Sequence, residues 1–470
     1  MNNKKTTKRA LLSSVMAIVL CLAMLIGTTF AWFTDTASTA VNKIQAGTLD
    51  VQLLDESGNS LESQTLAWQK AAGHESEEVL WEPGCTYKLQ PIVIKNNGNL
   101  ALKYKIVITG IQGDAELNEA IEWTITNTSA TTALDADHPL AAGASDTLTI
   151  SGHMKESAGN EYQGLSIEGI AITVVATQDT FEHDSNGNQY DAGAKYPVLS
   201  DTEFAEAIAS ATAGDTITLS SGTFILPATA IPADVVISGN GAANTAIVTN
   251  ADGYTIENDN VTIQNLTVDG RAASGVYYSG AINLRGNNAI LDNCVINGGG
   301  TGTWGASVYI SLNSGETAHI RNSIISGGFR GIFLGSQAGS VVVDSCDIDA
   351  VYPINVDGGG NFSLTVINSK LHGWTSYARI TSATFIDTEF SMGASGYDVV
   401  AAYTNTTFKN CTFDSAFKIY AQDQGFGFVF ENCMKDGVAV TAENFKTLFP
   451  EDPDVWTRCT CTVNGVAVTP

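Results

Sequence analysis

Apolar and polar residues alternate along several short segments in the first two-fifths of the chain. The clearest are residues 48–53, 87–89, 92–94, 104–108 and 170–174, separated by turn-forming residues at 56–59, 96–99 and 141–143. Alternation with a period of two turns one face of each strand toward a core. The pattern predicts an all-β domain over residues 32–196, a jelly-roll-like β-sandwich, with one helical turn at 117–121.

The remainder of the chain repeats one motif. Ile263-Gln264-Asn265-Leu266-Thr267-Val268 has later counterparts, each centred on an Asn, Asp or Ser that we call the anchor. The anchors are residues 265, 293, 322, 345, 368, 387, 410 and 432, spaced 28, 29, 23, 23, 19, 23 and 22 residues apart. Such a repeat predicts a right-handed parallel β-helix over residues 197–470. Asn tolerates left-handed backbone, so each anchor is expected in a turn, in a ladder with a spacing of about 4.8 Å.

Further apolar segments lie between the anchors and are expected to form a second set of strands. They are residues 281–284, 308–310, 331–334, 354–356 and 418–420. Before the first repeat, residues 204–211 have the pattern of a short amphipathic helix, followed by Gly214-Asp215-Thr216-Ile217 and Gly222-Thr223-Phe224. This order resembles the N-terminal cap and first turn of pectate-lyase-like β-helices. A cap is needed because the first turn would otherwise expose an apolar end.

The N-terminus has the composition of an export signal. Lys4, Lys5, Lys8 and Arg9 precede an apolar run from Leu11 to Gly27, and small residues follow at positions 29 and 31. This arrangement predicts a signal peptide over residues 1–31 that is removed. A permanent membrane anchor is the alternative, and the run is somewhat short for one.

Residues 27–35, Gly-Thr-Thr-Phe-Ala-Trp-Phe-Thr-Asp, resemble the cleavage region of SipW-type signal peptidase substrates, the TasA/camelysin family. Residues 94–99, 154–164 and 184–191 extend the resemblance. It implies secretion to the matrix or cell surface of a Gram-positive bacterium, with a SipW-type signal peptidase as partner. It also implies self-assembly of biofilm fibres by donor-strand exchange, in which Trp32, Phe33, Thr34 and Asp35 would complete a neighbour's sheet. The alternative is an ordinary first strand in its own domain.

The family includes proteins described as metallopeptidases, and the histidine spacing argues against that role here. His74, His138, His153 and His183 never occur one helical turn apart with a Glu between them, as a zinc protease needs. Asp184, Asn186, Asn188 and Asp191 bring oxygen donors close together and are weak calcium candidates. An Asx-rich turn is the favoured explanation of these four residues.

Charge and cysteine content narrow the function further. The formal net charge is −26, which makes nucleic acid a poor partner.

Cys294, Cys346, Cys411 and Cys433 each follow an anchor directly, which indicates a packing position for small apolar side chains. Only Cys411 and Cys433 lie on neighbouring turns, close enough for a disulfide.

Complete catalytic blocks of polygalacturonases are absent from the β-helix sequence. His372-Gly373 lacks a leading Gly, Arg379-Ile380 lacks a following Lys, and no Asp-Asp pair occurs. Glycoside hydrolases need paired carboxylates at a defined separation. The best acidic cluster has Asp344, Asp347, Asp349 and Asp357, with Arg330 and Arg321 one turn earlier, and these are weak catalytic candidates. Solvated strand faces and turns are the favoured explanation.

Two longer insertions explain the spacings of 28 and 29. They carry Asp269, Arg271, Tyr277, Tyr278 and Trp304, whose aromatic rings and polar groups suit a sugar or a protein partner. Rings that merely cover the side of the helix are an equal alternative. We therefore expect a secreted matrix or surface protein whose β-helix recognises a glycan or a protein. A polysaccharide lyase or hydrolase is the first alternative, and a camelysin-like metallopeptidase is the weaker one.

Overall fold

The computed structural model describes most of residues 49–469. It leaves out residues 1–48, 63, 65, 110–111, 115, 128–130, 135, 169–170, 180–193, 251–252, 271–279, 299–304, 328, 336–337, 357–359, 378–379, 394–395, 397–398, 451–452 and 470. The predicted signal peptide, the donor residues Trp32 to Asp35 and the calcium candidates at 184–191 therefore lie outside the described residues.

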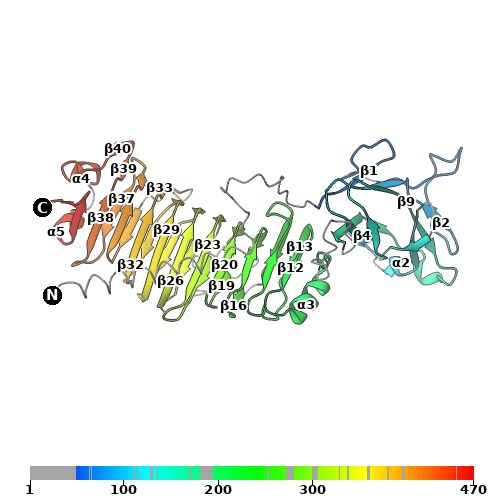
Figure 1. The fold of residues 1–470 in the computed structure, drawn as a ribbon, viewed down its shortest axis with the longest axis horizontal. Helices are drawn as coiled ribbons and strands as arrows, with labels where there is room; N and C mark the ends of the chain where they lie inside the picture. The colour runs from blue at the N-terminus through cyan, green and yellow to red at the C-terminus, as the bar shows by residue number, and fades with distance from the viewer. Residues whose placement is uncertain are drawn as a thin grey trace, which may run out of the picture. The chain divides into compact units, whose positions relative to one another are not determined.

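Residues 49–178 form antiparallel sheets, and every predicted segment overlaps a strand (Figure 1). The largest sheet contains β1 (Val51–Leu54), β3 (Ile92–Asn96), β9 (Ser145–Met154), β6 (Ile121–Thr126), β7 (Thr131–Ala133) and β2 (Thr86–Lys88). A second contains β11 (Ala171–Gln178), β4 (Leu102–Thr109) and β8 (His138–Leu140), and β10 (Ile167–Glu168) pairs with β5 (Gln112–Gly113). The predicted helical turn is α2 (Glu116–Glu119), and a 3-10 turn, η1, spans Asn160–Tyr162.

One buried cluster draws on both larger sheets of this region. Ile94 and Leu148 come from the first sheet, and Tyr104 and Ile106 come from the second. The Tyr104 hydroxyl donates to the Asp146 carboxylate at 2.7 Å, and burial together with this bond raises the pKa of Tyr104. Buried and half-buried residues alternate along β3, as predicted, whereas all four residues of β1 are half-buried.

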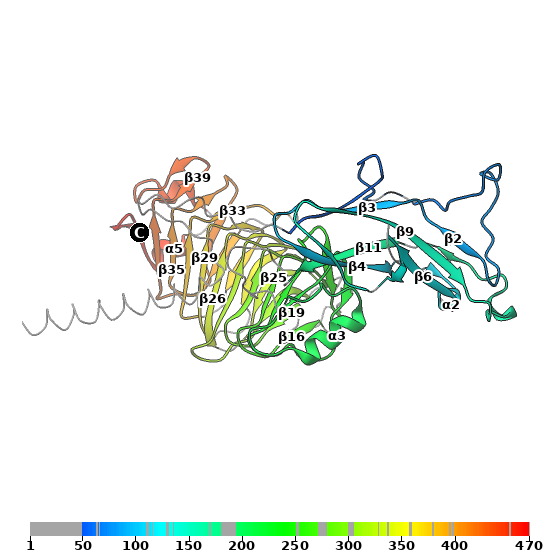
Figure 2. The ribbon, with the colours of Figure 1, turned by 45° about the vertical axis from the view of Figure 1, so that its right-hand side comes forward.

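From residue 216 the chain winds as a right-handed β-solenoid of about 8 turns. Three parallel sheets run along it, and the strands of successive turns lie side by side in Figures 1 and 2. The twelve-stranded sheet contains β12 (Thr216–Thr218), β14 (Val236–Ser238), β17 (Thr262–Gln264), β20 (Ala289–Asp292), β23 (Thr317–Arg321), β26 (Ala338–Asp344), β29 (Asn361–Ile367), β32 (Ser382–Ile386), β35 (Thr406–Lys409), β38 (Gly427–Glu431), β41 (Thr460–Val463) and the antiparallel β42 (Val466–Ala467).

The eleven-stranded sheet contains β13 (Gly222–Ile225), β15 (Thr245–Val248), β18 (Thr267–Asp269), β21 (Val295–Asn297), β24 (Ile324–Ser326), β27 (Asp347–Asp349), β30 (Lys370–His372), β33 (Glu389–Ser391), β36 (Thr412–Phe413), β39 (Met434–Lys435) and the antiparallel β40 (Val438–Ala439). The eight-stranded sheet contains β16 (Tyr254–Ile256), β19 (Gly280–Leu284), β22 (Ala306–Ile310), β25 (Arg330–Leu334), β28 (Tyr352–Val356), β31 (Thr375–Tyr377), β34 (Val399–Ala402) and β37 (Lys418–Ala421). The predicted second set of strands corresponds to strands of this sheet.

The anchors form the sharp corner between the twelve- and eleven-stranded sheets. All eight have positive φ, between 49° and 58°, as predicted for left-handed turn residues. Their side chains form a ladder: Asn293 Nδ2 donates to Asn265 Oδ1 at 2.9 Å, and Asn410 Nδ2 donates to Asp387 Oδ1 at 2.9 Å. Each motif therefore contains two short strands with the anchor between them. The first strand belongs to the twelve-stranded sheet and the second to the eleven-stranded sheet.

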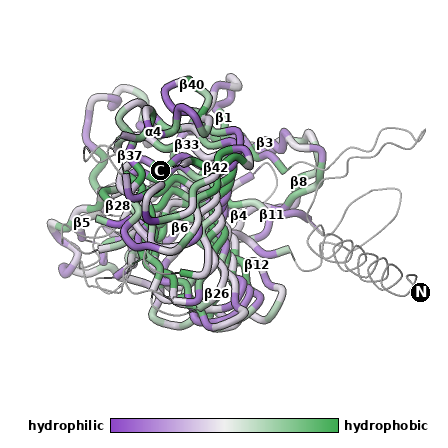
Figure 3. The backbone as a smooth tube through the Cα atoms, turned by 90° about the vertical axis from the view of Figure 1, so that its left-hand side faces the viewer, coloured by the Kyte–Doolittle hydropathy of each residue, from purple (hydrophilic) through white to green (hydrophobic). Residues whose placement is uncertain are grey.

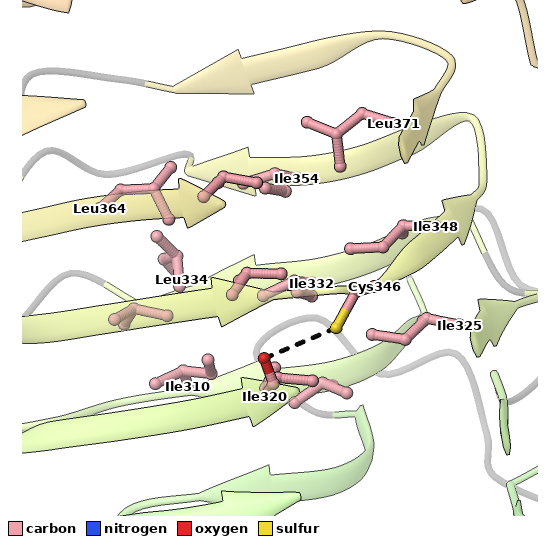
Figure 4. Close-up of a cluster of buried hydrophobic side chains, with 14 of the residues drawn as sticks. Ile310, Ile320, Ile325, Ile332, Leu334, Cys346, Ile348, Ile354, Leu364 and Leu371 are labelled. Carbon is pink, nitrogen blue, oxygen red and sulfur yellow. Dashed lines mark hydrogen bonds between the residues drawn. The ribbon is translucent and has the colours of Figure 1, made fainter. Parts of the chain in front are cut away.

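The solenoid interior is filled by apolar side chains from all three sheets (Figure 4). Ile320 belongs to the twelve-stranded sheet, Ile348 to the eleven-stranded and Ile332 to the eight-stranded. The Cys346 thiol donates to the Ile320 carbonyl at 3.5 Å, and Cys294, Cys411 and Cys433 are likewise buried. All cysteines of the described residues are free thiols, so these positions serve packing, as expected.

Both ends of the solenoid are covered. At the start, α3 (Asp201–Ser210) buries Phe204 and Ile208 completely, and Ser200 caps its N-terminus by accepting from the Glu203 amide. At the other end, α4 (Phe445–Leu448) and α5 (Asp454–Thr457) contribute Phe445 and Val455 to the core. In Figure 3, hydrophobic and hydrophilic residues alternate along the tube. No helix among the described residues is long and apolar enough to span a bilayer.

Candidate functional site

Half-buried polar residues line up along one side of the eleven-stranded sheet. The third residues of six successive strands pair in register: Asp269, Asn297, Ser326, Asp349, His372 and Ser391. The middle residue of each strand is buried in the core, so the third residue lies on the outer face. We call these six residues the polar column. Adjacent members are one turn apart, about 4.8 Å.

Two residues of the polar column and the neighbouring Asp347 form a chain of three contacting polar groups. His372 Nδ1 lies 2.5 Å from the Ser391 hydroxyl oxygen, and His372 Nε2 lies 3.1 Å from Asp347 Oδ1. Asp347 is the first residue of β27, and its side chain is 51% exposed, whereas the His372 side chain is 23% exposed. The imidazole is therefore held from both sides, on a face that solvent reaches.

A row of three aromatic rings follows the polar column at the corner that leads to the eight-stranded sheet. Phe329, Tyr352 and Trp374 come from successive turns, and all three are half-buried. The ring centroids of Phe329 and Tyr352 are 5.1 Å apart, and those of Tyr352 and Trp374 are 5.3 Å apart. Tyr352 comes three residues after Asp349, and Trp374 two residues after His372. We call these rings the aromatic ladder.

Two glycines allow backbone to pass close to the polar column. A Cβ on Gly393 would lie 2.6 Å from the His372 carbonyl oxygen and 3.1 Å from Asp349 Oδ1. A Cβ on Gly373 would lie 2.2 Å from the Ala350 carbonyl oxygen, at a φ of 130°. Glycine is needed at both positions because a side chain would displace backbone beside Asp349 and His372.

The structure does not gather the predicted acidic cluster in one site. Asp344 ends β26 in the twelve-stranded sheet and accepts from Asn368 Nδ2 at 3.1 Å, within the anchor ladder. Arg330 is 1% exposed, donates to Asn355 Oδ1 at 2.6 Å and lies 4.3 Å from the Phe333 ring centroid. Arg321 pairs with Asp292 at 2.9 Å. Only Asp347 and Asp349 lie in the polar column or beside it.

The predicted binding residues are described only in part. Asp269 belongs to the polar column, at its N-terminal end. Arg271, Tyr277, Tyr278, Trp304 and the acidic candidate Asp357 lie outside the described residues. Within the part of the chain that the structure describes, no three His, Cys, Asp or Glu side chains are grouped as a metal site would require.

Seven of the nine residues in the polar column and the aromatic ladder were not predicted from the sequence. His372 drew notice only as a fragment of a Gly-His-Gly block, and Ser391 and the aromatic ladder drew none. The usable signal was position within the repeat, because Ser326, Asp349, His372 and Ser391 each stand four residues after an anchor. Alignment of the repeats on the anchors would have placed these polar residues on one line.

A separate cavity of about 680 Å³ lies in the first part of the chain. Trp68, Trp81 and Trp123 line it, together with Leu117 and Met154. The Trp68 and Trp81 rings meet edge to face with centroids 5.4 Å apart. Glu82, Asn160 and Gln163 also line it, so the cavity has both aromatic and polar walls.

Residues 6–58 match the family model described as camelysin metallo-endopeptidase. No curated protein matches the chain. Among solved structures, the mannuronan C-5 epimerase AlgE4 A-module of Azotobacter vinelandii is 13% identical with a TM-score of 0.34, over 50% of this chain and 83% of that one. The pectin methylesterase PemA of Erwinia chrysanthemi is 14% identical with a TM-score of 0.34, over 56% and 98%.

A third similar structure is a PL6 family alginate lyase, AlyGC, at 10% identity and a TM-score of 0.35, over 50% of this chain and 43% of that one. At such low similarity, none of these proteins assigns an activity to this chain. The camelysin match covers a short N-terminal stretch, almost all of it outside the described residues, and the parallel strand pairing defines the β-solenoid independently.

Proposed function

We propose that this is an exported surface or matrix protein whose β-solenoid binds a linear polysaccharide along the aromatic ladder and the polar column. The observation that carries the proposal is that the aromatic ladder and the polar column run next to each other along the solenoid. Phe329, Tyr352 and Trp374 present one ring per turn, next to a row with Asp349 and His372.

A polysaccharide suits this surface for a physical reason. Each sugar ring has an apolar face that packs on an aromatic ring and hydroxyl groups at its rim that hydrogen-bond to polar side chains. Both rows repeat once per turn, about every 4.8 Å, so a polymer lying along the solenoid axis meets the same pair of groups repeatedly. Several weak contacts in line then add up to useful affinity.

Export and assembly belong to the same proposal. The signal peptide predicted from the sequence and the camelysin match at residues 6–58 support delivery to the cell exterior. Residues 32–196 would form a β-sandwich that assembles through the segment Trp32–Asp35. Deleting residues 32–36 should then leave the exported chain monomeric in sedimentation, whereas the intact chain should form polymers.

Binding is tested with residues 32–470 in affinity gels that contain neutral or acidic polysaccharides, with and without calcium. We expect at least one polysaccharide to retard the protein. Tyr352→Ala and Trp374→Ala should each weaken that retardation about tenfold, equivalent to the loss of one stacking contact of about 1.4 kcal/mol.

Tyr420→Ala is the matched control, because Tyr420 is also half-buried but belongs to β37, beyond the aromatic ladder. It should bind like the unchanged chain. Equal binding by the ladder variants and this control would remove the basis of the proposal. Circular dichroism of each variant verifies that the solenoid remains folded.

A further inference from the structure

Three neighbouring turns bring together an acid, an imidazole and a hydroxyl in the order that activates a nucleophile. Asp347 lies on β27, His372 on β30 and Ser391 on β33. The two contacts of the imidazole are 3.1 Å to Asp347 Oδ1 and 2.5 Å to the Ser391 oxygen. The parallel register places these strands next to one another, so the arrangement is a consequence of the solenoid itself.

The direction of the two hydrogen bonds follows from the chemistry of the partners. A carboxylate only accepts, so Asp347 fixes the imidazole proton on Nε2. Nδ1 then carries a lone pair and accepts the Ser391 proton. Serine, histidine and aspartate act in this way in serine hydrolases, although there Nε2 faces the serine and Nδ1 the aspartate. In this protein the two ring nitrogens have exchanged partners, but the serine still faces the nitrogen that accepts its proton and the aspartate still faces the N–H.

The surroundings leave the group open to a ligand. The Asp347 side chain is half exposed, and Ser391 is half-buried at the end of its strand. Trp374 of the aromatic ladder comes two residues after His372. The Met392 amide, next to Ser391, donates to Asp414 Oδ2 at 2.8 Å, so this amide is already engaged and does not serve an oxyanion.

We propose that Ser391, with His372 as general base and Asp347 as positioning residue, hydrolyses ester groups carried by the bound polysaccharide. This inference rests on the proposed function for the identity of the polymer. Esters are the class of substrate that fits. The Met392 amide already donates to Asp414, so it does not stabilise an oxyanion, and the substrate therefore needs a leaving group that departs more easily than an amine. An amide or glycosidic bond would demand more stabilisation of the transition state.

The reaction balances without a metal or a redox partner. Ser391 gives its proton to His372 Nδ1 while its oxygen attacks the acyl carbon. The bond from the acyl carbon to the sugar oxygen then breaks, and the imidazolium protonates that oxygen, so the sugar leaves with a free hydroxyl. His372 next takes a proton from water, whose oxygen attacks the acyl-serine. The bond from the acyl carbon to the Ser391 oxygen breaks, the imidazolium returns its proton to Ser391, and the carboxylic acid is released.

The test uses residues 32–470 with a fluorophosphonate probe, which phosphonylates activated serines with loss of fluoride, and with 4-nitrophenyl acetate. We expect mass spectrometry to find the probe on Ser391. Ser391→Ala and His372→Gln should each lower ester hydrolysis by about 100-fold or more, the usual contribution of a nucleophile or general base. Ser363→Ala is the matched control, because Ser363 is also half-buried but lies on β29 of the twelve-stranded sheet, away from the polar column.

Asp347 needs a different readout, since it acts through His372. Asp347→Asn should slow probe labelling, and Asp347→Glu should restore part of the rate because a carboxylate again fixes the imidazole tautomer. Labelling of Ser391 no faster than that of Ser363, or unaffected by His372→Gln, would overturn the proposal. Retardation of Ser391→Ala in polysaccharide gels separates the two claims, because loss of hydrolysis with intact binding leaves the binding function standing.

Discussion

At the scale of single residues, the anchors determine where the chain turns. Asn410 has a φ of 53°, a conformation that costs most L-residues about 1–2 kcal/mol. Its Nδ2 donates to Asp387 Oδ1 at 2.9 Å, and its Oδ1 accepts from Asn432 Nδ2 at 3.4 Å. One side chain thus relieves backbone strain and links three successive turns.

Replacing Asn410 tests these two contributions separately. Asn410→Ala loses both the tolerance of positive φ and the ladder bonds, so we expect a loss of about 2 kcal/mol in the free energy of unfolding. Asn410→Gly keeps the backbone tolerance and should lose about 1 kcal/mol. Urea unfolding followed by circular dichroism measures both. Equal losses for the two variants would mean that backbone strain has no part in the corner.

A second residue makes stability depend on pH. Burial, and then the Arg321 charge, lower the pKa of His319 below 6.5 in the folded chain. Below pH 6.5 the unfolded chain therefore binds more protons, and stability falls as the pH drops from 6.5 toward the folded pKa. His319→Gln should reduce the difference between urea midpoints at about pH 8 and about pH 5.5, the range in which histidine titrates. An unchanged difference would assign the pH effect to other groups.

At the scale of elements, α3 closes the apolar end of the solenoid. Phe204 and Ile208 are fully buried against the first turn, and the Phe204 ring meets Phe224 edge to face at 6.0 Å. Asp201 also holds this end, because its Oδ1 accepts from the Ile225 amide at 2.7 Å. The helix is therefore part of the core, since without it these contacts would face water.

Phe204→Ala should lower the free energy of unfolding by about 3–5 kcal/mol, the usual cost of removing a buried phenylalanine ring. It should also promote association, because the open end exposes strand edges and apolar side chains. Glu206→Ala, on the exposed face of α3, is the control and should have little effect. Thermal unfolding measures the loss of stability, and size-exclusion chromatography measures the association. A Phe204→Ala variant as stable as the Glu206→Ala control would show that α3 does not cap the solenoid.

The elements also show which features of the structure can be predicted from the sequence. The anchor repeat predicted the solenoid, the corner conformation and the buried cysteines, because backbone tolerance and apolar burial are local properties. Asp347 was a weak catalytic candidate, but its grouping with His372 and Ser391 was not predicted. The anchors set the register of these strands, which pairs Asp349 with His372 and His372 with Ser391. Which side chains then hydrogen-bond across the strands depends on their rotamers, and residue spacing does not specify those.

At the scale of the whole molecule, the solenoid turns a short motif into a long, regular surface. Each turn pairs only with the turns beside it, so a polar or aromatic position repeats along the axis with little dependence on distant residues. Such a surface matches an extended polymer better than a compact ligand. The chain's formal charge of −26 disfavours nucleic acid among the extended polymers.

Hydrogen exchange of residues 32–470, with and without the polysaccharide that retards the protein most, tests the binding claim most directly. The account predicts slower exchange of backbone amides at the corner that carries Phe329, Tyr352 and Trp374, and in β27, β30 and β33 beside it. The twelve-stranded sheet should exchange as before and serves as the internal control. Protection confined to that sheet, or no protection by any polysaccharide of the panel, would contradict the account.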